Sequence, residues 1–154
     1  LIILINLGGS MKSVKLFLLV ILFFSVGNLF ATNNYSVREG VFIHISSGFD
    51  NPHKVVMALS LALKMADDHD VFIFMDIKAP EVVLTNSKSI EMNKFEHSKI
   101  LIAKLLEKDV RIAVCPMCLE VMNKTQFDLM RGIKIAEKED FFDFTRGRII
   151  SLSY

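Results

Sequence analysis

Four runs of β-branched and aromatic residues alternate with segments of helical spacing along the chain. The runs cover residues 40–46, 70–76, 110–114 and 148–153. The second run is almost continuously apolar, which is typical of a strand buried on both faces of a parallel sheet. Alternating strands and helices joined by right-handed crossovers predict an α/β fold. We therefore expect a three-layer sandwich, with a mainly parallel sheet and helices on both faces.

Helices are predicted between these strands. Apolar residues recur at helical spacing over residues 54–66, where Asn51 suits the N-cap and Pro52 the first helical position. Residues 95–108 show the same spacing. Shorter helical segments are expected at 81–84, 119–123 and 127–133.

A second apolar stripe runs along the first of these helices. It consists of Met57, Leu61 and Met65, on a different flank from the positions that face the core. A helix that covers a sheet in a monomer is expected to be polar on its outer face. The stripe therefore predicts a homo-oligomer.

Residues 11–31 have the pattern of a signal peptide. Lys12 and Lys15 precede the apolar run 16–24, and small residues follow at Gly27 and Ala31. The run is shorter than the roughly 18 to 20 residues of a membrane-spanning helix. We expect a periplasmic or secreted protein, attached to a membrane only if the signal peptide stays uncleaved. Residues 1–10 are interpreted as non-native upstream residues, and residues 32–154 as one domain.

Charge narrows the choice of partners. The 154 residues include 18 Lys and Arg against 17 Asp and Glu, for a formal net charge of +1. The two signs are interspersed, so no basic stripe predicts a nucleic-acid partner.

The candidate chemistry lies in the sequence Cys115-Pro116-Met117-Cys118, which contains both cysteines of the chain. A buried strand ends at Cys115, and Pro116 suits the first turn of a helix, so Cys115 is predicted to be its N-cap. First-turn N–H groups favour a thiolate at that position, which makes Cys115 the candidate nucleophile. Cys118 follows on the same helical face and is interpreted as the resolving thiol.

Other interpretations of this pair stay open. Two buried cysteines are also found as small apolar core residues. A CxxC at a helix start is used by thiol–disulfide oxidoreductases, although no proline follows Pro116 to supply the loop of a thioredoxin-type site. Met117 with both cysteines is a donor set for Cu(I), whereas two thiolates are too few for a closed zinc site. No resident cofactor or metal is predicted, and enzymatic turnover is left undecided.

The rest of a candidate pocket is expected where other strands end, because open α/β sheets bind ligands at that edge. Ser47, Asp50 and Asn51 follow the first strand and are candidate pocket residues. His44 alternates with apolar neighbours and is interpreted as a core or edge residue. The other three histidines are interpreted as solvated, and no histidine is assigned a catalytic role.

The order of these segments resembles the DsrE/DsrF-like (DsrEFH superfamily) sulfur-relay proteins. The resemblance covers residues 40–154 and rests on the loop 46–52, the strand and cysteine at 108–115, the segment 129–132 and the closing strand 149–154. It implies an α/β sandwich that assembles into oligomers, with a cysteine that accepts sulfane sulfur as a persulfide at the position of Cys115. A sulfur donor or acceptor protein is the implied partner. Carriers of this family are cytoplasmic, whereas this chain has an export signal.

Overall fold

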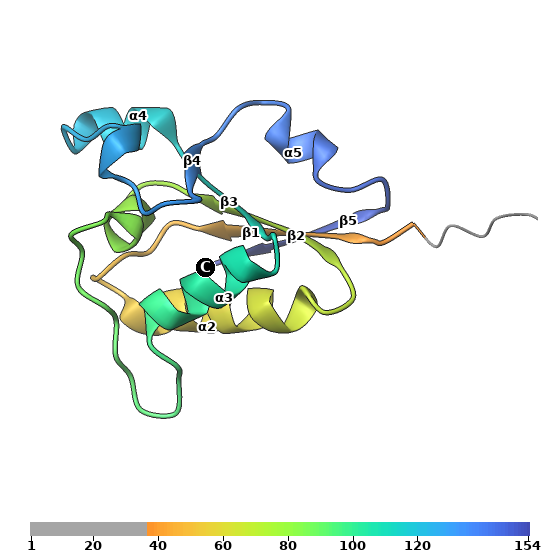
Figure 1. Cartoon of the computed structure of the whole chain (residues 1–154), viewed down its shortest axis with the longest axis horizontal. Helices are drawn as coiled ribbons and strands as arrows, with labels where there is room; N and C mark the ends of the chain where they lie inside the picture. Colours follow the sequence, from red (N-terminus) through yellow and green to blue (C-terminus); the bar gives the residue numbers. More distant parts are fainter. Residues whose placement is uncertain (1–36) are drawn as a thin grey trace, which may run out of the picture. The chain divides into compact units, whose positions relative to one another are not determined.

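The computed structural model describes residues 37–154, which contain one parallel sheet of five strands (Figure 1). The strands are β1 (Gly40–Ile45), β2 (Asp70–Met75), β3 (Arg111–Val114), β4 (Lys134–Ile135) and β5 (Ile149–Ser153). Their spatial order is β4-β3-β2-β1-β5, and every pair is parallel. Ile45 pairs with Met75 and Met75 with Val114, so the three central strands are aligned at their carboxyl ends.

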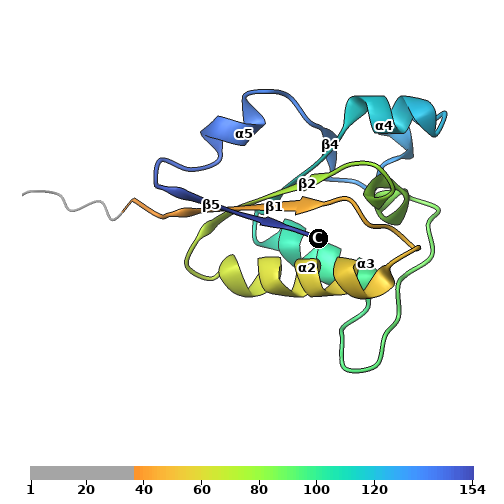
Figure 2. The same ribbon diagram turned by 180° about the vertical axis from the view of Figure 1, so that it is seen from behind.

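One face of the sheet carries the main apolar core beneath helices α2 (Pro52–Met65) and α3 (Ser98–Glu107). Figures 1 and 2 show these two helices side by side on the same face. Aliphatic side chains alternate toward them from the strands, and fully buried examples are Val41, Ile43, Ile45, Ile73, Met75 and Ile112. Burying one such side chain stabilises the fold by about 1.5 to 3 kcal/mol. The helices therefore fix the sheet on which the candidate site is built.

The opposite face is covered by α4 (Pro116–Val121) and α5 (Asp140–Asp143) (Figures 1 and 2). It is rich in aromatic side chains. Phe141 lies 5.7 Å from Phe42, 5.3 Å from Phe72 and 5.0 Å from Phe74, measured between ring centroids. The offset and edge-on arrangements are those that aromatic rings favour. The short α5 is thus held on the sheet by Phe141.

The predicted fold class is confirmed. The elements predicted from the hydrophobic pattern are present, with bounds that differ by a few residues, and η2 (Ala79–Val83) and η3 (Gln126–Asp128) occupy two of the expected short helical segments. The sequence patterns did not predict β4 or α5. Among the described residues, no helix is long and apolar enough to cross a membrane. The signal peptide assigned to residues 11–31 and the upstream residues 1–10 lie outside the described part.

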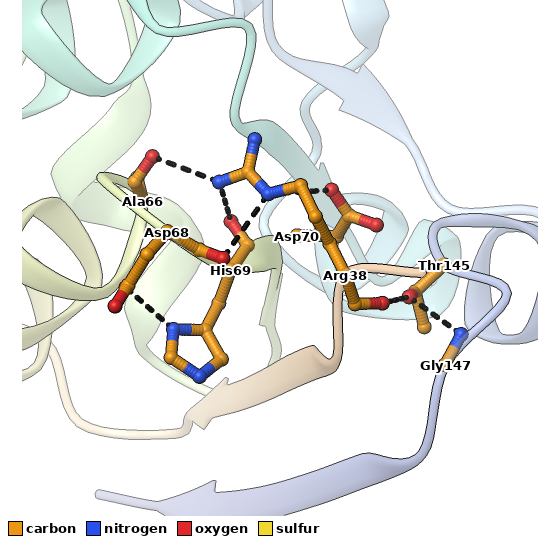
Figure 3. Close-up of polar contacts among 7 residues, drawn as sticks. All are labelled: Arg38, Ala66, Asp68, His69, Asp70, Thr145 and Gly147. Atoms are coloured by element: carbon orange, nitrogen blue, oxygen red, sulfur yellow. Dashed lines mark hydrogen bonds and ion pairs between the residues drawn. The ribbon is translucent and has the colours of Figure 1, made fainter. Parts of the chain in front are cut away.

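Arg38 fastens the start of β1 to the end of α2 (Figure 3). Its guanidinium donates to the carbonyl oxygens of Ala66, Asp68 and His69, at 3.4, 3.2 and 2.8 Å. It also pairs with Asp70, and its own carbonyl accepts the hydroxyl of Thr145 at 2.8 Å. Carbonyls at a helix end lack intrahelical partners, so an arginine satisfies them well. This cluster, here called the Arg38 clamp, lies at the amino ends of the strands.

Candidate functional site

The carboxyl ends of β1, β2 and β3 meet at one edge of the sheet, because the three strands are parallel and in register. Ser46 follows β1, Asp76 and Ile77 follow β2, and Cys115 follows β3. The backbone N–H of Cys115 donates to the carbonyl of Met75 at 2.9 Å, which extends the ladder one residue beyond β3. Three loops therefore deliver polar groups and sulfur to the same place.

Cys115 is the N-cap of α4 and Pro116 occupies its first turn, as predicted. The carbonyl of Cys115 accepts the N–H of Leu119 at 3.3 Å, which closes the first helical turn. Within the described chain, however, the Cys115 sulfur makes no capping hydrogen bond with the first turn. The predicted preference for a thiolate at Cys115 is therefore not carried by a direct capping bond, and its role as the nucleophile stays a prediction. Cys115 remains half-buried at the end of the strand, as a free thiol.

The second cysteine, in contrast, accepts a hydrogen bond from the backbone. The backbone N–H of Ile77, in the loop after β2, donates to Cys118 Sγ at 3.1 Å. Burial raises the pKa of the Cys118 thiol, and its hydrogen bond with Cys115 and the charge of Asp76 act in the same direction. These effects outweigh the Ile77 N–H, which lowers it. The pKa of Cys118 is thus raised overall, and Cys115 contributes to that rise.

A histidine and an aspartate pair on the aromatic face, and the aspartate is near enough to act on the Cys118 thiol. His44 Nε2 is 2.9 Å from Asp76 Oδ2, and the hydroxyl of Ser46 is 3.2 Å from the same nitrogen. A carboxylate oxygen accepts, so Nε2 carries the hydrogen. The imidazole is stacked on Phe74, with ring centroids 5.7 Å apart. Stacking and hydrogen bonding together fix the ring.

Sequence patterns alone did not identify this pair. The sequence pattern indicates a core or edge position for His44 and gives Asp76 no role beyond the strand 70–76. The signal that could have found them is positional: His44 lies opposite Phe74 in the parallel register, and Asp76 follows Phe74 by two residues on the same face.

The three candidate pocket residues after β1 have local structural partners. Asp50 accepts the Gly48 N–H at 2.9 Å and pairs with Lys78 at 3.1 Å. These bonds lower the pKa of the Asp50 carboxyl, the Gly48 N–H having the largest effect. Asn51 occupies the N-cap of α2 without a side-chain capping bond, and Ser47 is half-buried. Their assignment to a ligand pocket stays a prediction.

A cavity of about 280 Å³ lies at the far edge, beside the Arg38 clamp, and one of about 240 Å³ lies nearer the loops of the candidate site. The smaller one is lined by Phe49 and by residues of the segments 81–87 and 124–128. Neither Ser47, Asp50, Asn51 nor a cysteine is among its lining residues. This edge of the sheet therefore has a hollow next to the first loop, but the sulfurs do not open into it.

Residues 37–154 contain no group of three or more His, Cys, Asp or Glu side chains arranged to hold a metal ion. The Cu(I) hypothesis used Met117 as its third ligand. That side chain is 72% exposed. Nothing in the described geometry supports the metal hypothesis over thiol chemistry.

The fold and site define a class of small α/β proteins that carry a pair of free cysteines at the carboxyl edge of a parallel sheet. Among solved structures, the chain is similar to the YchN protein of E. coli, with a TM-score of 0.61 at 16% identity over 76% of this chain and 99% of that one. It is also similar to MTH1491 of Methanobacterium thermoautotrophicum, a protein of unknown function, with a TM-score of 0.52 at 11% identity over 75% and 99%. No family model and no curated protein matches the sequence. The chain thus has a DsrE-like fold.

Proposed function

We propose that this chain is an exported sulfur carrier or sulfurtransferase-like protein, with Cys115 as the sulfur acceptor and Cys118 as the resolving thiol. The observation that carries the proposal is the placement of two free thiols at the carboxyl edge of the sheet, with Cys115 as the N-cap of α4 and Cys118 in its first turn. Ligands bind at this edge in open α/β folds, and the DsrE-like fold is that of sulfur-relay proteins.

A donor of the persulfide class can load sulfur onto Cys115 without any other reactant. The Cys115 thiolate attacks the outer sulfur of a donor R–S–SH, the donor's S–S bond breaks, and R–S⁻ leaves. The product is Cys115–S–SH. An acceptor thiolate removes the outer sulfur by the same reaction in reverse, so that carriage alone needs no net oxidant or reductant.

Resolution is a separate reaction that uses Cys118. Its sulfur attacks Cys115 Sγ, the bond to the outer sulfur breaks, and the outer sulfur leaves as H₂S. The two thiol sulfurs are oxidised to a disulfide while the sulfane sulfur is reduced. A dithiol reductant then restores the pair. The raised pKa of Cys118 suits a resolving thiol. A protonated thiol does not compete with Cys115 for the sulfur donor.

A thiol–disulfide redox protein is the second candidate. It is favoured by the spacing of Cys115 and Cys118, which lie one helical turn apart at the start of α4 as two free thiols. The two functions differ in what Cys115 carries between reactions: a sulfane sulfur in the first, and a bond to Cys118 or to a partner thiol in the second.

Intact mass spectrometry of protein isolated from its own compartment distinguishes the two. A carrier gains the mass of one sulfur atom, and cyanide or a thiol reductant removes it. A redox protein loses two hydrogens instead. Cys115→Ser should abolish sulfur loading, while Cys118→Ser should lengthen the lifetime of the persulfide. Loading that survives Cys115→Ser would contradict the assignment.

The proposal that the protein is exported rests on the sequence of residues 11–31 alone. Amino-terminal sequencing of the mature protein is expected to start between residues 28 and 32. A chain that starts at Met11 in a cytoplasmic fraction would contradict export and leave the thiol chemistry untouched.

A further inference from the structure

One buried oxygen of the candidate site, Asp76 Oδ1, lacks a hydrogen-bond partner among the described residues. Oδ2 of the same carboxylate, in contrast, bonds to His44. Leaving a buried acceptor unpaired costs about 1 to 3 kcal/mol, so such an atom in a folded protein requires an explanation.

The explanation lies in the neighbouring thiol. Ile77, the residue after Asp76, donates its backbone N–H to Cys118 Sγ. The carboxylate and the hydrogen-bond donor of the sulfur are therefore on adjacent residues of one loop. The Asp76 charge also acts on the Cys118 thiol. Cys118 donates no hydrogen bond to Oδ1 in this geometry, so this oxygen is an open acceptor one residue away from the backbone N–H that contacts the sulfur. His44 engages only the far oxygen and leaves Oδ1 unoccupied by any described donor.

We propose that Asp76, positioned by His44, accepts the proton of Cys118 as this thiol attacks the sulfur carried by Cys115. In the resolution step the Cys118 S–H proton passes to Asp76 Oδ1, the new Cys115–Cys118 bond forms, and HS⁻ leaves. Asp76 then returns the proton to give H₂S. The proposal rests on the proposed function for its natural substrate, but the proton transfer requires only an activated sulfur on Cys115.

A test that needs no sulfane sulfur follows from that independence. The reduced protein is treated with limiting 5,5′-dithiobis(2-nitrobenzoate), which places thionitrobenzoate on Cys115. Attack by Cys118 then releases a second, coloured thionitrobenzoate in a first-order step. The rate of this second release is measured for the full chain and for Asp76→Asn, His44→Gln and the control Asp67→Asn, an exposed aspartate that pairs with Lys108.

The sign of the change separates proton transfer from a plain charge effect. If Asp76 acts only through its charge, Asp76→Asn increases the thiolate fraction of Cys118, and release becomes faster. If Asp76 accepts the proton, Asp76→Asn slows release by about 10²-fold. His44→Gln slows it less, Asp76→Glu recovers part of the rate, and Asp67→Asn leaves it unchanged. A release rate that is faster or unchanged in Asp76→Asn overturns the proposal.

The pH profile of the unmodified protein provides the same decision without any variant, should Asp76→Asn fail to fold. The titratable groups that face the reaction are Cys115 on α4, Asp76 after β2 and His44 on β1, while Lys78 is paired with Asp50. A proton-accepting carboxylate makes the release rate nearly independent of pH between about 6 and 8. A tenfold rise per pH unit over that range shows that only preformed thiolate reacts, and overturns the proposal.

The role of Asp76 and the sulfur-carrier function can fail independently of each other. If Cys115 takes up no sulfur from any persulfide donor but Asp76→Asn still slows thionitrobenzoate release, the sulfur-carrier function fails and the role of Asp76 stands. If sulfur loads normally and Asp76→Asn has no effect on release, the reverse holds.

Discussion

The backbone N–H of Ile77 donates a hydrogen bond to Cys118 Sγ, at 3.1 Å, across 41 positions of sequence. Ile77 has a backbone φ of 51°, in the left-handed region that β-branched residues avoid. Its side chain is 64% exposed, so packing does not hold it there. The conformation directs the N–H toward the sulfur, and strain of this kind is typical of functional sites.

Replacing Ile77 with Asn should raise the free energy of unfolding by about 0.5 to 1 kcal/mol, because Asn tolerates the left-handed conformation better. Urea denaturation measures the change. The matched control is Ile100→Asn on the exposed side of α3, where the same swap should lower stability because Asn is a weaker helix former. Equal effects at the two positions would show that Ile77 is unstrained.

The two cysteines should differ in reactivity. Burial and its contact with Cys115 raise the pKa of Cys118, so less of it is thiolate near pH 6.5. Limiting iodoacetamide should therefore label Cys115 first in the reduced protein, and labelling of Cys118 should increase with pH. Peptide mapping by mass spectrometry reads both sites in one sample. Equal labelling of the two thiols would remove the basis for assigning them different roles.

Asp140 should contribute stability that depends on pH. It is 5% exposed; burial opposes its ionisation, but Lys134, the Glu137 N–H and Arg111 outweigh burial and lower its pKa. A lowered folded pKa means that the stabilisation is present above the unfolded value, near 3.8, and is lost as the pH falls through the folded value.

Asp140→Asn should accordingly lower the free energy of unfolding by about 1.5 to 3 kcal/mol at pH 7. The difference from the unmodified protein should shrink below pH ~3.8. Asp143→Asn, an exposed aspartate of the same helix, should change little at either pH. Urea denaturation at pH 7 and pH 3 provides the comparison, and a loss of stability that is independent of pH would point to packing instead of charge.

Gly48 should not tolerate a side chain. A Cβ atom there would lie 2.5 Å from the Lys78 carbonyl oxygen and would also collide with the Glu81 carboxylate, which accepts the Phe49 N–H at 2.6 Å. Gly48→Ala should cost about 1 to 3 kcal/mol because the backbone must shift. Ser60→Ala in α2 is the control and should be nearly neutral. A stable Gly48→Ala variant would mean that the two loops are less closely joined.

A homo-oligomer remains a prediction from the second apolar stripe of α2. Met57 is 41% exposed, whereas Leu61 and Met65 are half-buried, so Met57 is the better probe. Met57→Glu should dissociate the assembly by burying an unpaired charge in each interface. Leu61→Glu should do the same with a greater loss of subunit stability. Light scattering at micromolar concentration measures the oligomeric state, and Arg131→Glu serves as the control. A monomeric unmodified protein would contradict the prediction.

The strands and long helices were predictable because the faces that are buried determine where apolar residues occur in the sequence. The run Val71–Met75 is apolar throughout since both faces of β2 are covered, and α2 repeats apolar residues toward the sheet. The two-residue β4 and the four-residue α5 have no such period. Asp140 bonds to Lys134, which ties α5 to β4, so tertiary contacts define both elements.

The site was only half predictable, for a related reason. Cys115 and Cys118 are separated by one helical turn and are recognisable as a pair in the sequence. His44 and Asp76 are 32 positions apart, and only the parallel register brings them together. The direction of the Ile77 N–H depends on one backbone angle, which no side-chain pattern encodes.

The Arg38 clamp has a consequence for how the protein is oriented when it is attached to something. It fixes the chain's entry into β1 at the amino edge of the sheet, and the six residues of β1 then span about 20 Å before the cysteine edge is reached. A bead, surface or fusion partner joined ahead of Val37 would therefore meet the molecule on its thiol-free side. The two cysteines would then lie at the opposite edge of the sheet from the point of attachment.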